Sequence, residues 1–231
     1  MKTDVSPPNG SPCPPPTAVG GLSLKHRAYV ALKGLILSGA LPPGTLLSER
    51  QLARSLKMSK TPVHAALERL EGDGLVTVAA QQGIVVRAIS PQEIADHFEL
   101  REALETFVVA RLAGRLTPEQ ASRLKRNLRE HRRVVRQGDI AGHIRLDSEF
   151  HLMLCEFLGN QEITRAMGQI RDKIQGVIHH ISTRFPQRVL ASLSEHEAVV
   201  TAILAGNGPA ASERMTAHLR RGLQSVYDRQ G

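Results

Sequence analysis

The chain has 231 residues, 41% of them hydrophobic and none of them tryptophan, which is enough for two small domains with aliphatic cores. Lys and Arg outnumber Asp and Glu by 30 to 22, and the net charge of +8 favours a polyanionic partner such as nucleic acid. No apolar segment has the length of a membrane span or the position of a secretory signal. The two cysteines, Cys13 and Cys155, form no CxxC pair, so we expect reduced thiols in a cytoplasmic protein.

Residues 1–21 contain six prolines among serine, glycine and threonine. Such a segment buries too little apolar surface to offset the entropy of ordering it, so the sequence predicts a disordered tail.

Residues 22–88 have the pattern of a small DNA-binding domain. A helix is predicted to begin at Leu24 and to end before Gly39. A capping box, Ser48 to Gln51, is predicted to start a second helix, and Ser59 is predicted to cap a third. The apolar stripe of the first helix comprises Leu24, Ala28, Ala31, Leu32 and Leu35.

Two short β-branched runs, 75–78 and 84–87, follow the third helix and are predicted to pair as a hairpin through residues 79–83. Three helices and a hairpin are typical of a winged helix-turn-helix, in which the second and third helices read DNA.

From Pro91 to the end, residues 91–231, every pattern is helical. Six helices in antiparallel succession predict a bundle able to enclose a ligand, so the fold class is mainly α. The predicted helices cover about 92–116, 118–137, 140–158, 162–182, 186–205 and 210–228. The apolar positions of the first helical pattern are Ile94, Phe98, Leu104, Phe107, Val108 and Leu112.

Asp147 and His151 lie four residues apart, so helical geometry places them on one face. His196 and His218 each lie in a later helix, and all four could converge on one divalent metal ion. The alternative for each histidine alone is a hydrogen-bonded core residue. The remaining histidines of the bundle fit no such pattern and are interpreted as surface or pocket-lining residues: His131, His143, His179 and His180.

The runs 41–53 (LPPGTLLSERQLA) and 59–63 (SKTPV) resemble the DNA-binding head of GntR-family transcriptional regulators. Residues 99–105 (ELREALE), with Asp147, His151, His196 and His218, resemble the FadR-type (FCD) effector domain of that family. Six helices match the shorter, VanR-like form of that domain. The resemblance covers the chain from about residue 22 to 229.

The resemblance implies a double-stranded DNA operator as partner. Arg50 is suited to phosphate or guanine contacts, and Lys60, Thr61 and His64 lie at the start of the helix that enters the major groove. Gly83 at the wing tip permits close approach to the sugar-phosphate backbone. Lys60 and His64 stand where the family usually has arginine, so a different operator is expected; solvated surface is the alternative for these side chains.

The resemblance also implies a homodimer, more often a repressor, released by a small organic acid bound at the metal. Zinc is the favoured ion, with nickel, cobalt and manganese as alternatives. Arg101 could pair with the acid in fork geometry, or form an internal salt bridge with Glu102 or Glu105.

Two other functions compete with a ligand-responsive regulator. A site of three histidines and one aspartate could activate water in a metal-dependent hydrolase carrying a DNA-binding appendage, although no general base occurs at a motif spacing. A purely structural metal in a constitutive DNA-binding protein would make operator binding insensitive to small molecules.

Overall fold

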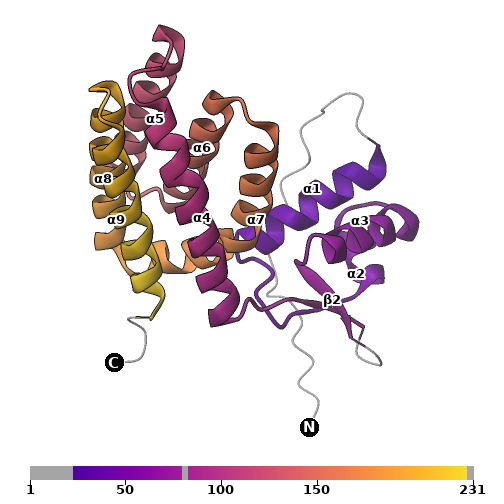
Figure 1. Ribbon diagram of the computed structural model, residues 1–231. Coiled ribbons are helices and arrows are strands. Elements are labelled where there is room, and N and C mark those ends of the chain that lie inside the picture. The colour runs from indigo at the N-terminus through magenta and orange to yellow at the C-terminus, as the bar shows by residue number, and fades with distance from the viewer. Residues whose placement is uncertain (1–22, 80–82, 228–231) are drawn as a thin grey trace.

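A computed structural model describes residues 23–79 and 83–227 of the chain. The predicted tail, residues 1–21, lies outside these residues, as does most of the predicted hairpin turn. Within them, two helical domains follow one another along the chain, and Figure 1 shows α7 of the second domain beside α1 of the first. The mainly α fold predicted from the sequence is confirmed.

The N-terminal domain combines three helices with a small antiparallel sheet. Its elements are α1 (Leu24–Leu37), β1 (Leu46–Leu47), α2 (Glu49–Ser55), α3 (Lys60–Gly72), β2 (Val76–Ala79) and β3 (Gly83–Val86). The strand order is β1-β3-β2, with Val85 opposite Leu46 and Val86 opposite Val76. The hairpin was predicted, whereas β1 was not, because a two-residue strand carries no periodic signal.

The first helix buries only part of the predicted stripe. Ser23 caps α1 by accepting a hydrogen bond from the His26 amide. Leu24, in the first turn, is 54% exposed, whereas Ala28, Tyr29 and Leu32 are buried. The prediction was wrong for Leu24 because the core lies only beneath the middle of the helix.

The capping box predicted at Ser48 is also wrong. Ser48 occupies the N-cap position of α2, but its hydroxyl makes no capping hydrogen bond. Ser59, which was predicted to cap the third helix, likewise occupies the N-cap position of α3 without a capping hydrogen bond from its side chain. The side-chain caps of the described helices include Ser90 and Thr117, which form capping boxes at α4 and α5.

The C-terminal domain is a bundle of long helices. They are α4 (Pro91–Leu112), α5 (Pro118–Arg136), α6 (Ile140–Leu158), α7 (Gln161–Arg184), α8 (Pro186–Leu204) and α9 (Gly208–Tyr227). Helix α4 ends at Leu112, four residues before its predicted end. Gly114 there adopts a φ of +70°, and its amide donates to the Ile203 carbonyl of α8 at 3.0 Å, which leads the chain out of the helix.

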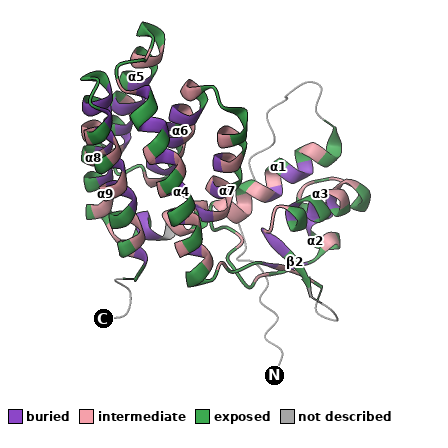
Figure 2. Cartoon of the chain, in the orientation of Figure 1, coloured by how far each residue is buried: buried purple, intermediate pink, exposed green. Residues whose placement is uncertain are grey.

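Apolar residues of all six helices form one continuous core, and Figure 2 shows buried positions on the sides of the helices that face one another. Phe98 belongs to this core, whereas Phe107, an apolar position of the same helical pattern, is 51% exposed. Phe107 lies one residue before Val108, which takes the inward position on α4. None of the helices described is long and apolar enough to cross a membrane.

A polar contact joins the two domains. The Lys33 ammonium of α1 lies 2.5 Å from the Asp172 carboxylate of α7, and both side chains are mostly buried. Lys33 also donates to the Tyr29 hydroxyl at 2.9 Å, which in turn donates to Asp73 at the end of α3. The head is therefore attached to α7 through groups that reach its third helix.

Candidate metal and effector site

Three histidines from different helices converge inside the bundle. His151 of α6, His196 of α8 and His218 of α9 are all buried. The Nε2 atom of His218 lies 3.3 Å from the Nε2 atoms of both His151 and His196. Among the described residues, these three form the group whose possible ligand atoms all lie within 4.8 Å of one another.

The fourth predicted ligand, Asp147, lies beside this cluster. Its Oδ1 atom is 3.6 Å from His196 Nε2 and accepts a hydrogen bond from the Ser192 hydroxyl at 3.1 Å. The structure thus brings the three histidines together and places Asp147 next to His196, one helical turn before His151 on α6.

Two glutamates that sequence reasoning missed orient the histidine rings. Glu105 of α4 is hydrogen-bonded to His151 Nδ1, and Glu195 Oε2 lies 2.7 Å from His218 Nδ1. A carboxylate on Nδ1 leaves Nε2 free to accept a metal and fixes the ring orientation. Contacts between helices have no fixed sequence spacing, so no sequence pattern pointed to these residues.

Burial and neighbouring charges set the protonation of the cluster. Burial lowers the pKa of His196 well below its ordinary value, and burial also lowers the pKa of His218 against the opposing effect of Glu195. Burial opposes ionisation of Glu105, but Arg101 and His151 bring its pKa to about 2. Burial acts likewise on Asp147, whose pKa His196 and His151 nevertheless lower. Neutral imidazoles and an ionised carboxylate are the forms that bind metal.

The donor set fits a divalent transition metal. Two nitrogen ligands at about 2.05 Å from a tetrahedral zinc ion lie roughly 3.3 Å apart, which agrees with the two Nε2 separations. One feature is less favourable, since the buried Nδ1 of His196 has no hydrogen-bond partner in the described part of the chain.

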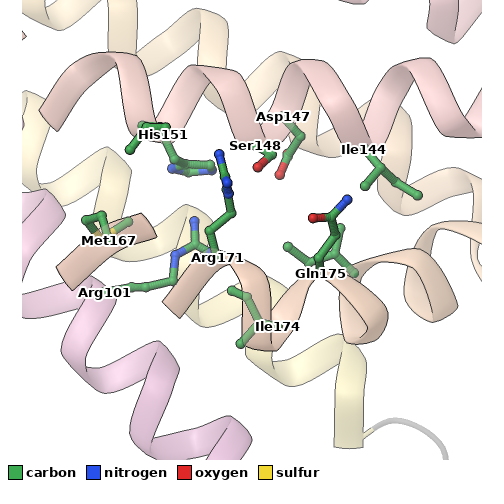
Figure 3. A pocket seen from close by; sticks show the side chains of 11 residues that line it. Arg101, Ile144, Asp147, Ser148, His151, Met167, Arg171, Ile174 and Gln175 are labelled. Atoms are coloured by element: carbon green, nitrogen blue, oxygen red, sulfur yellow. The ribbon is translucent and has the colours of Figure 1, made fainter. Parts of the chain in front are cut away.

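Arg101 adopts the internal pairing foreseen as an alternative. Its Nε atom donates to Glu105 Oε1 at 2.6 Å, and both side chains are buried, whereas Glu102 pairs with Arg220. The same arginine lines two cavities beside the cluster. Figure 3 shows Arg101 of α4 and Arg171 of α7 reaching toward α6, which carries Asp147, Ser148 and His151.

The two cavities are small, about 20 and 50 Å³, enough for one and a few water molecules respectively. The first has an apolar wall formed mainly by Ile144, Leu152, Met167, Ile174 and Ile178. The second is more polar, with His143, Ser182, Arg188, Ser192 and His218 in its wall. Arg101, Asp147 and Ile178 line both.

Two of the other histidines lie next to the cluster. His143 lines the second cavity, in agreement with its interpretation as a pocket-lining residue. His131 is fully buried in the core, so for this residue the interpretation was wrong, and its Nε2 lies 2.7 Å from His143 Nδ1. They lie beside the cluster because His143 is one turn before Asp147 on α6. His179 is half-buried near Gly39 of the head, and the side chain of His180 lies outside the described part of the structure.

The predicted DNA-contacting residues are accessible in the head. Arg50 at the start of α2 and Lys60, Thr61 and His64 in the first two turns of α3 are exposed. Gly83 at the start of β3 is exposed with a φ of +92°, a conformation that favours glycine. His64 is not free, because its Nδ1 lies 2.7 Å from Glu49 and its Nε2 3.5 Å from Glu68. The hydrogen bond with Glu49 raises its pKa, so His64 carries more positive charge near neutral pH than the sequence suggested.

Comparisons with known proteins cover nearly the whole described chain. Residues 24–86 match the family described as "Bacterial regulatory proteins, gntR family", and residues 96–221 match the "FCD domain". A regulator from an unstable DNA locus of Streptomyces ambofaciens is 31% identical over 217 residues, covering 90% of this chain and 85% of its own. The transcriptional repressor RspR of Escherichia coli is 27% identical over 207 residues, 88% of this chain and 89% of its own. Among solved structures, E. coli McbR/YncC aligns with a TM-score of 0.80 at 22% identity, covering 91% of this chain and 100% of that one, which supports the fold.

Proposed function

Because the chain belongs to the gntR family of bacterial regulatory proteins and carries an FCD domain, we propose that it is a metal-dependent repressor that leaves its operator when a small carboxylate binds the bundle. That it is a transcriptional regulator and not an enzyme follows from the family. The observation that carries the rest is the convergence of three buried Nε2 atoms beside Asp147, next to cavities lined by Arg101.

In this proposal His151, His196, His218 and Asp147 hold one divalent ion, zinc in the first instance. A bound ion supplies a Lewis-acidic centre that attracts a carboxylate. Glu105 and Glu195 keep the Nε2 atoms of His151 and His218 directed at the ion. Arg101 offers its remaining N–H groups to the acid while its Nε stays with Glu105.

The head is proposed to bind a duplex operator through α3 in the major groove. Exposure of Arg50, Lys60, Thr61 and His64 on α2 and α3 supports these residues as contacts, and Gly83 supports a wing contact with the backbone. We propose that two copies act as a homodimer on a pseudo-palindromic operator in the cytoplasm, since paired heads read paired half-sites.

The proposed signal passes through α7. Arg171 lines the first cavity and donates to Asp172 at 3.1 Å, and Asp172 holds Lys33 of the head. Cavities of about 20 and 50 Å³ leave little room for an organic acid unless side chains move. In this proposal the acid favours a second arrangement of α7, and operator affinity changes only by the difference in acid affinity between the two arrangements.

Operator fragments selected from genomic DNA of the source allow a direct test by fluorescence anisotropy. We expect a carboxylate to weaken operator binding by about 5- to 150-fold, the usual range of allosteric coupling. Removing the metal with a chelator should abolish this effect. If metal and carboxylates change nothing while the operator still binds, the protein is a constitutive DNA-binding protein and its sensor role is wrong.

A further inference from the structure

The second cavity contains a cationic group that the metal site does not use. Arg188 of α8 lines it together with Arg101 of α4, and the Arg188 side chain is 13% exposed. Arg188 Nη2 donates to Glu195 at 2.7 Å and to the His218 carbonyl at 3.3 Å. Its other terminal nitrogen, Nη1, is buried and has no partner among the described residues. An unpaired buried donor on a charged group is costly, so a complementary acceptor is expected there.

The charges around Arg188 leave a local excess of positive charge. Glu195 is shared between Arg188 and Arg221, which lies 3.1 Å from its Oε1 atom, and it also holds the His218 ring. One carboxylate thus serves two guanidinium groups. Asp147 is the acidic residue in the cavity wall, and it lies with the histidine cluster.

A hydroxyl group completes the polar wall. Ser182 of α7 is buried and lines the same cavity. A serine hydroxyl in a cavity wall can donate a hydrogen bond to a ligand oxygen.

From these contacts we propose that the effector is a dianion, of which a dicarboxylate is the simplest form, and that Arg188 and Ser182 bind its second carboxylate. The inference rests on the proposed function, in which the first carboxylate lies by Arg101 and the metal cluster. Arg188 Nη1 and the Ser182 hydroxyl donate to the second carboxylate, and this anion balances the positive charge that Glu195 leaves.

The first cavity favours the alternative effector, a monocarboxylate. Its wall of Ile144, Leu152, Met167 and Ile174 would suit the hydrocarbon end of a monocarboxylate. Acids of equal length that differ in one terminal group therefore distinguish the two cavities.

The experiment is calorimetric titration of the metal-loaded full-length protein with succinate against butyrate, and with glutarate against valerate. We expect at least one dicarboxylate to bind about tenfold or more tightly than its monocarboxylate partner, as one added charge-assisted hydrogen bond allows. Arg188→Gln should weaken that dicarboxylate by about 10- to 100-fold and leave the monocarboxylate within about twofold.

Two further variants separate this role from support of the metal site, since Arg188 touches Glu195. Arg221→Gln removes the other arginine of Glu195, lies on the surface and should keep the preference for the dicarboxylate. Ser182→Ala leaves Glu195 untouched and should reduce the preference about three- to tenfold. If elemental analysis shows that Arg188→Gln has lost its metal, the test rests on Ser182→Ala. An unchanged preference of Ser182→Ala for the dicarboxylate over the monocarboxylate then overturns the proposal.

The outcomes distinguish the two proposals. Equal binding of mono- and dicarboxylates, or equal losses for both in Arg188→Gln, overturns the dianion inference and leaves the carboxylate-responsive regulator standing. Binding of neither class to the metal-loaded protein overturns both.

Discussion

Replacing His196 tests the metal centre most directly. This residue is fully buried, and its ring stacks on Phe150 with centroids 4.1 Å apart. His196→Gln is preferable to alanine, because glutamine retains much of the volume and avoids a cavity in the core. The variant removes one of three converging Nε2 atoms and should lose most of its metal. Elemental analysis should give about one metal ion per chain for the wild type, as expected of a single four-ligand site, and much less than one for the variant.

The thermal consequence can be worked out from the size of the bundle. Free metal at ~100 times its dissociation constant adds about 2.7 kcal/mol to the free energy of unfolding. For a domain the size of residues 91–227, 1 kcal/mol shifts the melting temperature by roughly 3 °C, so a chelator should lower the wild-type Tm by about 8 °C. His196→Gln should show almost no chelator response.

A matched control is available beside the site. His131 is as fully buried as His196, and the two rings lie 5.8 Å apart, but its Nε2 atom is paired with His143. His131→Gln should therefore be destabilised yet keep its metal and the chelator response. A wild-type protein that binds no metal and melts identically with and without chelator would refute the proposed centre.

Three other predictions concern DNA, coupling and pH. Arg50→Ala should weaken operator binding by about 1–3 kcal/mol and relax sequence preference if Arg50 contacts a base, whereas a phosphate contact would lower affinity for all sequences alike; a gel-shift titration distinguishes them. Lys33→Met, which breaks the contact with Asp172, should reduce the carboxylate-induced change in operator dissociation constant by about tenfold, and an unchanged value would exclude this contact from the coupling. Burial lowers the pKa of His131 from 6.5 to about 4, so between these pH values the unfolded chain binds a proton that the folded protein does not, and the free energy of unfolding should fall as pH drops, by up to about 3 kcal/mol at pH 4. Urea unfolding should show this slope in wild type and a shallower one in His131→Leu.

Local geometry explains which parts of the site could be predicted. The position of Asp147 relative to His151 follows from helical spacing alone, and the bounds of α6 were predicted to the residue. The approach of His196 and His218 depends on how α8 and α9 pack against α6, and the sequence supplied it only through family resemblance. Glu105 was foreseen as a possible partner of Arg101, but not as a partner of His151, because that contact crosses between helices 46 residues apart.

The sequence predicted least well which apolar residues at the edge of a core are exposed. The apolar residues Leu24 and Phe107 continue the helical stripes of their sequences, yet both lie outside the cores. A periodic pattern identifies the inward face of a helix but not where along that face a neighbouring element ends. The two arginines of the second cavity illustrate the same limit, since Arg188 becomes notable only through the positions of Glu195 and Arg101.

The arrangement of α7 ties recognition of the acid to the head. Residues 171, 174, 175 and 178 of this helix line the first cavity, at the spacing of one helical face. Asp172 lies about 100° around the helix from Arg171, and it holds Lys33 in a mostly buried contact. One rigid helix thus carries the cavity wall and the attachment of the head on adjacent faces. We infer that an acid that displaces the Arg171 side chain or turns α7 changes the environment of Asp172 directly, so no separate transmitting segment is needed between the sensor and the head.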